Sequence, residues 1–392
     1  MRYPHLTNIQ PVLDAIQGVP GIVASRTPHG YNVVDYQYIL PGETFRDITT
    51  LTPEAATNEL LRRECRGIKY NNHGDIIARP YHKFFNIGEM DETHPDRISI
   101  NGEHSPLYLS KLDGSMIHPT YLPNTSPLHT RKGQNDVSAQ ANRFIDDQPN
   151  YHRFIADTRQ AGYTPIFEWC TPQNTIVLHH DTDELIITNI RHIASGDYLS
   201  PQERDRWAHD HHIPTAPIHT IEADNTHALI DKIREDKDIE GYILVLDGLF
   251  YKVKTKDYME KHRSFNILYT KNGVLRAILH GEEDDIIPTV NAIHQQRIRD
   301  YAHVVHTNIR QSMQAYIDAH TFIQHPQQYS KKDYVPQLHA SNIPKILHGP
   351  LIMHYTDQNI MKNITQHVAK NFIKRDSRNA LINALNIPTW KP

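Results

Sequence analysis

The 392-residue sequence has little cysteine, no long apolar run and no excess of charge of one sign. Its two cysteines, Cys65 and Cys170, cannot build a disulfide framework and do not show metal-ligand spacing. This favours a reducing intracellular compartment. No run approaches the roughly 18 apolar residues of a membrane span, and the N-terminal residues lack the charged-then-apolar pattern of a signal peptide. We therefore expect a soluble, cytoplasmic protein.

The charge balance narrows the possible partners. Lys and Arg number 41 against 45 Asp and Glu, for a formal net charge of −4 with histidine neutral. A general polyanion-coating protein is excluded, and any nucleic-acid contact must come from local basic patches. The 28 histidines gather most closely at residues 179–180 and 209–212. Neither group is joined by a second well-spaced ligand pair, so a solvated surface is favoured over a zinc site.

The length and the pattern along the chain predict two domains. Short strands broken by turns are expected in residues 30–40, 66–81, 104–117, 163–171, 174–180, 183–193 and 240–255, with helices in 53–65, 138–162 and 226–238. This is the pattern of an α+β domain of antiparallel sheets, residues 1–260. From Val290 to Tyr316 apolar residues recur every three to five positions, which predicts a long helix. A loop around residues 325–337 and a helix over 356–376 complete an all-helical domain, residues 261–392.

The stretch SKLDGSMI, residues 110–117, places Lys111 directly after a strand-like run. Lysine is strongly hydrated and a poor strand residue, so this position is costly unless the side chain has a task. The alternative is a hairpin turn at Asp113 and Gly114, with Lys111 facing water. As a nucleophile, Lys111 would need nearby cations or desolvation to lose its proton.

Other segments supply charges that suit a polyphosphate substrate. The cationic candidates are Arg66, Lys83, Lys132, Lys252 and Lys254, the last two on one face of a strand. Glu168 and Glu240 lie among strand-type apolar residues. An unpaired carboxylate would favour the charged, unreactive form of Lys111, whereas bound Mg²⁺ would offset the negative charge. Taken singly, Glu168 could be the buried partner of an arginine, and the two lysines could line a solvated hairpin.

Five segments resemble motifs I, III, IIIa, IV and V of the covalent lysyl nucleotidyltransferases: SKLDGSMI, IFEWCTPQNTIVL, LIITNIRHIASGDYLS, EGYILV and YKVKTKDY. The upstream block ECRGIKYNNHGDIIARPYHKFFN resembles the RNA ligase 1 family, typified by a bacteriophage tRNA-repair enzyme. The resemblance covers roughly residues 30–262. It implies a nucleotidyltransferase fold, an ATP-grasp-like ligase domain of antiparallel sheets with flanking helices, followed by the all-α domain.

The resemblance also implies the chemistry of an ATP-dependent RNA ligase. The motif I lysine, here Lys111, attacks ATP to form lysyl-AMP, AMP passes to an RNA 5′-phosphate, and a 3′-hydroxyl then seals the bond. Mg²⁺ is the expected metal, with Mn²⁺ as a substitute, and single-stranded RNA ends, with nicked tRNA as one candidate, are the expected partners of a monomer. RNA or tRNA repair would be the task, in the host cytoplasm if a bacteriophage encodes the protein.

Residue roles carry over by position. Lys252 and Lys254 would bind the α-phosphate. Glu168 and Glu240 would contact the ribose or bind the metal ion. Phosphate or nucleotide contacts are implied for Arg66, Lys83, Lys132, Ile243, Tyr36, Tyr38 and Tyr258. Lys132 lacks the serine that commonly follows Lys-Gly in the family, and the upstream tyrosines fit an ordinary core role equally well.

Two alternatives stay open. A capping-type guanylyltransferase or a DNA ligase shares the lysine chemistry, but both normally carry an OB-fold after motif V, and no such strand pattern follows Tyr258. A non-catalytic RNA-binding protein with this fold would be expected to lose the nucleophile or the motif V lysines, which are present. No motif after residue 262 matches the family's tRNA-specific domain, so that domain either binds RNA or braces the catalytic one.

Overall fold

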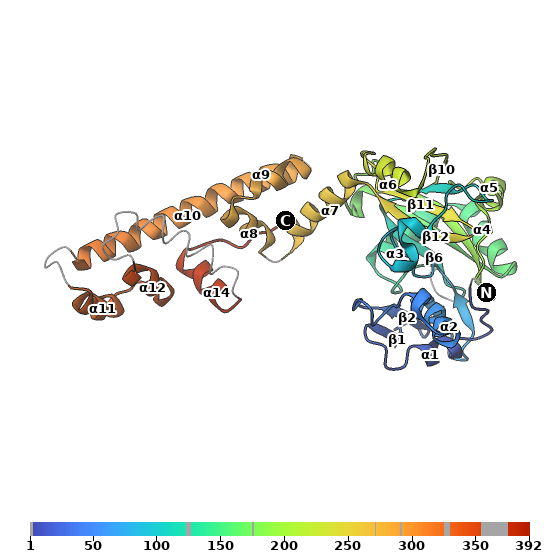
Figure 1. Cartoon of the computed structure of the whole chain (residues 1–392), viewed down its shortest axis with the longest axis horizontal. Coiled ribbons are helices and arrows are strands. Elements are labelled where there is room, and N and C mark those ends of the chain that lie inside the picture. The colour runs from blue at the N-terminus through green and yellow to red at the C-terminus, as the bar shows by residue number, and fades with distance from the viewer. Residues whose placement is uncertain are drawn as a thin grey trace. The chain divides into compact units, whose positions relative to one another are not determined.

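A computed structural model of the chain describes residues 3–122, 127–174, 176–270, 272–290, 292–324, 330–353 and 375–392. The chain forms two compact units, Met1–Met259 and Glu260–Pro392. Figure 1 shows that the described part of the first unit holds antiparallel sheets with flanking helices and that of the second holds helices. The predicted α+β class with a helical C-terminal region is confirmed. None of the helices in these ranges is both long and apolar enough to cross a membrane.

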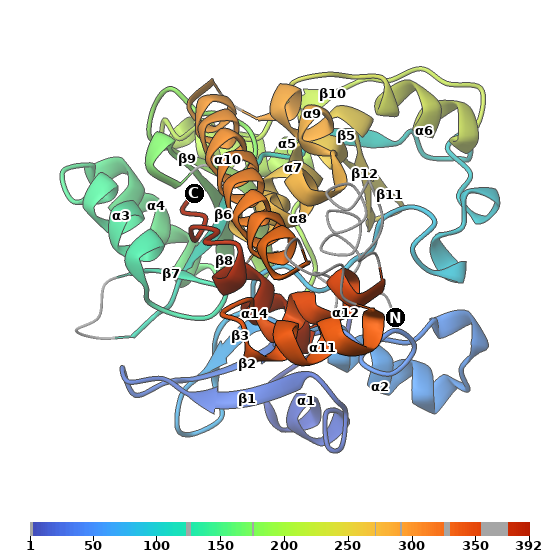
Figure 2. The ribbon, with the colours of Figure 1, turned by 90° about the vertical axis from the view of Figure 1, so that its left-hand side faces the viewer.

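The first sheet of unit 1 carries strands in the order β1 (Ile22–Arg26), β2 (Asn32–Tyr36), β3 (Arg66–Tyr70) and β4 (Ile76–Ala78), all antiparallel. Helices α1 (Gln10–Ala15) and α2 (Pro53–Arg63) share an apolar core with it. Figure 2 shows the ribbons of both helices near this sheet. Helix α2 begins where the Thr52 hydroxyl accepts a hydrogen bond from the Ala55 N–H and Pro53 opens the first turn.

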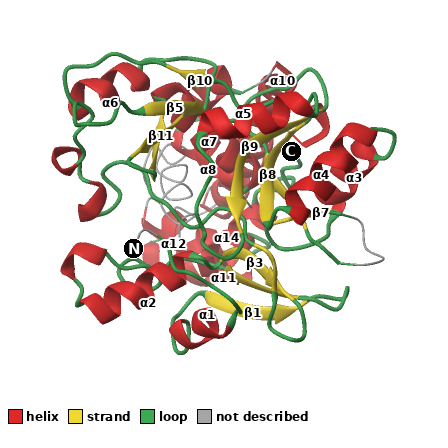
Figure 3. Ribbon diagram, turned by 90° about the vertical axis from the view of Figure 1, so that its right-hand side faces the viewer, coloured by secondary structure: helices red, strands yellow, loops and turns green. Residues whose placement is uncertain are grey.

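Two further four-stranded sheets complete the strands of unit 1. One has the order β10 (Ile218–His219), β5 (Leu107–Ser110), β11 (Gly241–Leu246) and β12 (Leu249–Lys254), and α6 (Thr226–Arg234) packs on it. The other has the order β7 (Leu128–Thr130), β6 (Ser115–Pro119), β8 (Tyr163–Cys170) and β9 (Glu184–His192). Helices α3 (Asp136–Ile145) and α4 (Pro149–Gln160) cover this sheet beside β8 (Figure 3), and α5 (Pro201–Asp210) also contributes to its core.

Two local expectations need correction, and the alternative of a hairpin turn after Lys111 is excluded. Residues 111–114 are not a hairpin turn, because β5 and β6 belong to different sheets. Residues 176–178 form bends and residues 179–180 are irregular, rather than a strand, since the Asp113 carboxylate takes the N–H groups of Val177 and Leu178 that a strand would pair. Residues 331–337 are helical rather than a loop, as part of α11 (Lys331–Ala340).

The second unit contains most of α7 (Lys256–Tyr269), then α8 (Gly273–His280), α9 (Glu283–Ile286), α10 (Ala292–Gln324), α11, α12 (Lys345–Met353) and α14 (Arg375–Ala384). The predicted stripe on α10 is buried at Tyr301, Val305, Ile309 and Met313, but Ile293 is 68% exposed. The helix predicted over residues 356–376 lies almost wholly outside the described residues, which resume at residue 375.

Candidate active site

A cavity of about 380 Å³ opens in unit 1 between β5, β11, β12 and the segment of residues 81–89. Seven of the predicted site residues line it: Arg66, Lys83, Lys111, Glu168, Ile243, Lys252 and Lys254. These residues come from five separate stretches of the sequence. The sequence predicted these residues on separate segments, and the fold brings them together around one cavity.

Lys111 leaves the end of β5 with its backbone held by a neighbouring strand. Its N–H donates to the Gly241 carbonyl at 2.9 Å, and the N–H of Ser110 donates to the Pro217 carbonyl. The Lys111 Nζ lies 2.6 Å from the Glu240 carboxylate. The ammonium is thus aimed into the cavity from a well-ordered strand end, which is the placement that a nucleophile requires.

Asp113 and Gly114 hold the backbone that follows Lys111 in its position between two sheets. The buried Asp113 carboxylate accepts hydrogen bonds from the N–H groups of Val177 and Leu178 at 2.8 and 2.6 Å, and from the Tyr258 hydroxyl at 2.7 Å. A Cβ at Gly114 would lie 2.5 Å from the Trp169 carbonyl oxygen, so only glycine fits. This pair anchors the link between two sheets.

The β11–β12 hairpin presents two lysines to the cavity. Its turn residues Asp247 and Gly248 both have positive φ, as a two-residue type I′ turn requires. Lys252 and Lys254 then fall on one face of β12, with Val253 buried on the other. Lys252 Nζ lies 4.6 Å from the centre of the Phe84 ring, and Lys254 Nζ lies 3.0 Å from the Glu240 carboxylate.

The cations of the site lie close enough to affect one another. Burial, and then the positive charges of Arg66, Lys83 and Lys111, hold the pKa of Lys252 well below its ordinary value. Such mutual repulsion is unfavourable in the protein alone, and a bound anion relieves it. The arrangement is therefore suited to a polyphosphate.

Two carboxylates oppose these cations. Burial raises the pKa of Glu168 to about 7, the charge of Lys111 lowers it, and the negative charge of Glu240 raises it further. Among the described residues there is no group of three or more potential metal-ligating side chains. Magnesium, however, is usually held by one or two carboxylates together with substrate phosphates and water. A pair of carboxylates in which Glu240 disfavours the charged form of Glu168 fits that mode of binding.

Other predicted site residues lie away from the cavity wall. The Tyr36 ring packs on Phe45 and under the Arg131 guanidinium, Tyr38 is 55% exposed, and Lys132 is exposed. Tyr258 is buried and acts on the site through Asp113. The structure thus brings Tyr258 and Glu240 to the site as neighbours of lining residues, and does not bring Tyr36, Tyr38 and Lys132 into the cavity lining.

Sequence reasoning missed several residues that line the cavity, notably Phe84, Asn86 and Glu89. Glu89 pairs with Lys83 at 3.3 Å and accepts hydrogen bonds from Asn86. Their segment reaches the site by pairing with β12, because the N–H of Lys252 donates to the Phe85 carbonyl and that of Ile87 to the Lys252 carbonyl. A backbone pairing between positions so far apart leaves no spacing signal in the sequence.

Comparison with known proteins places the chain in a family. A family model described as RNA ligase matches residues 64–259, half of the chain. The chain belongs to this RNA ligase family, and the prediction of a phage-type RNA ligase 1 relationship is confirmed.

Two proteins similar to this chain are also named as RNA ligases. A relative from Thermovibrio ammonificans, whose name assigns it to the RNA ligases, is 30% identical over 245 residues, covering 59% of this chain and 61% of that protein. RNA ligase 1 of bacteriophage TS2126 is 24% identical over 208 residues, covering 49% of this chain and 50% of that protein. The chain thus spans about half to three fifths of the length of these relatives.

Solved structures give weaker likenesses. An archaeal ATP-dependent RNA ligase matches with a TM-score of 0.41 at 11% identity, over 95% of this chain and 85% of that one. A Naegleria gruberi RNA ligase mutant with ATP and Mn matches with a TM-score of 0.34 at 17% identity, over 40% and 51%. At these scores neither likeness supports an inference about the site.

Proposed function

We propose that this protein is an ATP-dependent RNA ligase that joins 5′-phosphate and 3′-hydroxyl RNA ends through a lysyl-AMP intermediate. The observation that carries the proposal is the convergence of Lys111 with Arg66, Lys83 and Lys252 around one cavity. A nucleophilic lysine among fixed cations suits attack on a polyphosphate, where positioning and electrostatic stabilisation do most of the catalytic work. Family membership supports the same reaction class.

In the first step the Lys111 ammonium gives up one proton to solvent, and the resulting neutral Nζ attacks the α-phosphorus of ATP. The P–N bond forms as the bond to the bridging oxygen breaks, pyrophosphate leaves, and the Nζ proton passes to solvent. Lys252 and Lys254 are placed to stabilise the charge that develops on the phosphoryl oxygens. The hydrogen bond from Lys111 to Glu240 orients the attacking side chain.

In the second step an oxygen of the RNA 5′-phosphate displaces Lys111 from the AMP phosphorus, and the departing amine takes up a proton from solvent. In the third, the 3′-hydroxyl of another end attacks the RNA phosphorus, its proton passes to solvent, and AMP departs. Arg66 and Lys83, at the cavity wall, are the candidates to contact the RNA phosphate. Glu168 and Glu240 would hold Mg²⁺, which would offset phosphate charge when bound. We further propose single-stranded RNA ends, including those of nicked tRNA, as the substrate and RNA repair in the cytoplasm as the task.

Intact mass spectrometry tests the proposal. Wild-type protein incubated with ATP and Mg²⁺ should gain the mass of one AMP, and Lys111→Ala should not. Lys256→Ala is the matched control, because Lys256 lies on the surface and pairs with Glu235. An adduct with GTP but not ATP would instead favour a guanylyltransferase. No adduct with either nucleotide, in protein free of pre-bound AMP, would overturn the ligase mechanism and favour an RNA-binding role.

A further inference from the structure

A second cavity of about 280 Å³ lies beside the first in unit 1. Lys83 and Phe84 line both cavities, so these two side chains form the partition between them. On the side of the first cavity, Lys252 Nζ approaches the Phe84 ring at 4.6 Å. The Phe84 ring also packs against Phe250, which lines the second cavity, with centroids 5.6 Å apart. One aromatic ring and one cation therefore lie between the second cavity and the candidate active site.

Several aromatic side chains line this second cavity. Phe84, Phe85, Phe250 and Tyr251 all line it. Two cations lie near the Phe85 ring, with Lys83 Nζ at 4.2 Å and the Arg63 guanidinium carbon at 5.0 Å from its centre. Flat apolar walls beside a positive charge suit a flat, uncharged ring attached to an anionic group.

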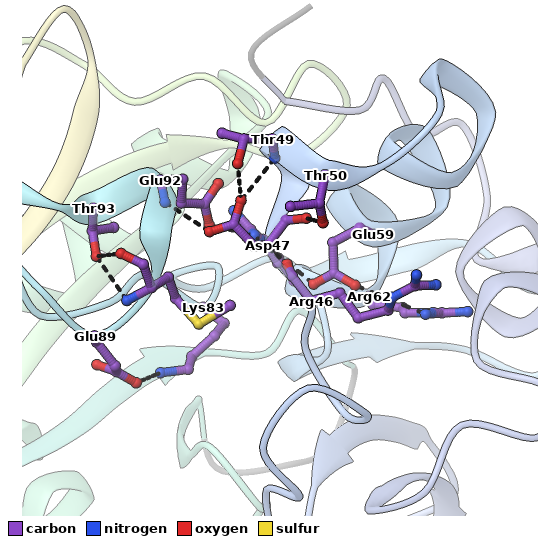
Figure 4. Close-up of polar contacts among 12 residues, drawn as sticks. Arg46, Asp47, Thr49, Thr50, Glu59, Arg62, Lys83, Glu89, Glu92 and Thr93 are labelled. Carbon is purple, nitrogen blue, oxygen red and sulfur yellow. Dashed lines mark hydrogen bonds and ion pairs between the residues drawn. The ribbon is translucent and has the colours of Figure 1, made fainter. Parts of the chain in front are cut away.

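Ion pairs hold the polar edge of the cavity in place. Arg63 contacts Glu59 at 3.3 Å and Glu92 at 2.5 Å. Glu92 is itself anchored, because its N–H donates to the Asp47 carboxylate at 2.7 Å, as Figure 4 shows together with the Lys83–Glu89 pair. The cavity is thus built from a rigid frame before any ligand arrives, which lowers the entropic cost of binding.

We propose that the second cavity takes the base of the 5′-terminal nucleotide of the RNA end that becomes adenylylated. This inference rests on the proposed ligase function. The phosphate of that end must reach the nucleotide on Lys111, and Lys83 is the cation shared by the two cavities. With the phosphate at Lys83, the attached nucleoside has the second cavity next to it, and its base can stack on the aromatic walls. The volume lies just below the roughly 300 Å³ at which pockets for drug-sized ligands begin, which suits a single nucleoside.

Two variants test this assignment without altering the cations of the site. Leu60→Trp fills the cavity from α2, and Tyr251→Ala removes one aromatic wall. Lysyl-AMP formation from ATP should stay within about twofold of wild type in both. The KM for a 5′-phosphorylated oligoribonucleotide in AMP transfer should rise by about tenfold or more, the loss expected when a stacked base is released. Leu40→Trp and Tyr269→Ala, at exposed positions, are the matched controls and should leave both steps unchanged.

A binding measurement on the wild-type protein does not depend on how a variant folds, and absence of the quenching described next would overturn the assignment. An oligoribonucleotide with 2-aminopurine at its 5′-terminal position should lose fluorescence on binding the wild-type protein, and Tyr251→Ala should restore it. An unchanged KM in both variants, or a signal that does not respond to Tyr251→Ala, would overturn the assignment. A wild-type protein that forms no lysyl-AMP would instead overturn the proposed function, so the two failures are distinguishable.

Discussion

Glu240 Oε1 lies 2.6 Å from the Nζ of Lys111, and the same oxygen lies 3.0 Å from the Nζ of Lys254. Glu240 is only 3% exposed, so its charge is compensated chiefly by these two lysines. One carboxylate therefore orients both the proposed nucleophile and a proposed phosphate ligand.

Replacing Glu240 with Gln should slow lysyl-AMP formation by about 100-fold or more, because a misplaced reacting group costs that much in rate. The amide keeps the shape but loses the charge that holds both ammonium groups. Single-turnover formation of lysyl-AMP from ATP measures the effect. Glu235→Gln, which breaks an exposed pair with Lys256, is the control and should react at the wild-type rate. Equal rates for both variants would show that Glu240 does not position Lys111.

Gly114→Ala should abolish lysyl-AMP formation while leaving the protein folded. The added Cβ would meet the Trp169 carbonyl oxygen at 2.5 Å and the Glu168 side chain at 3.0 Å. To relieve this clash, the peptide after Lys111 or the strand that carries Glu168 must move. The same adduct measurement detects the loss, and circular dichroism checks the fold. Gly349→Ala is the matched control, because no atom lies within 4 Å of a Cβ there and its backbone is not in the positive-φ region. An active Gly114→Ala would contradict the expectation.

Local chemistry explains which parts of the fold the sequence could predict. The Asp-Gly pair at residues 247–248 lies between two apolar strand segments, which is a pattern typical of a hairpin, and it forms the turn between β11 and β12. The single helical stretch expected over residues 138–162 is two helices, since Pro149 begins α4. The Asp-Gly pair at residues 113–114 has the same composition as a hairpin turn, yet its partners, Val177 and Tyr258, are distant in sequence.

In the candidate site, too, some residues could be predicted from their local sequence and others could not, because contacts between distant segments place them. Charged residues among apolar strand residues, such as Glu168 and Glu240, could be predicted because burying a charge is costly without a role. Glu89 and Phe84 could not be, because the pairing of their segment with β12 decides their place. Tyr36 and Tyr38, which were carried over by position alone, lie outside the cavity lining.

Asp35 should make the stability of the protein fall as the pH rises from about 4 to about 6. Burial raises its pKa to about 6, although the charges of Arg131, Lys69, Arg66 and Lys132 lower it. Because the folded state binds the proton more tightly than the unfolded chain, it is favoured at low pH, and this advantage is lost as the carboxyl ionises.

Asp35→Asn lacks this titration. Relative to wild type it should gain up to about 2 kcal/mol in the free energy of unfolding between pH 4 and pH 7, since each pKa unit is worth about 1.4 kcal/mol. Urea unfolding at several pH values measures the difference. Asp181→Asn, at a side chain that is 95% exposed, should run parallel to wild type. A difference between Asp35→Asn and wild type that does not vary with pH would show that Asp35 is not the titrating group.

Glu64→Gln should destabilise the protein by about 3 kcal/mol or more, the usual result of removing one partner from a buried ion pair. The Glu64 carboxylate contacts Arg191 at 2.8 Å and Arg79 at 2.9 Å, and all three side chains are almost completely buried. Burial opposes its charge, but the two guanidinium groups outweigh that effect and hold the pKa of Glu64 well below its ordinary value. The contribution to stability is therefore present above the unfolded pKa of a glutamate, near 4.3, and is lost as the pH falls through the lower folded value.

Urea unfolding at pH 7 should show a lower midpoint for Glu64→Gln with an unchanged slope, and an unchanged midpoint for the exposed control Glu43→Gln. A Glu64→Gln midpoint equal to that of wild type would mean that the two arginines find other partners in the folded state.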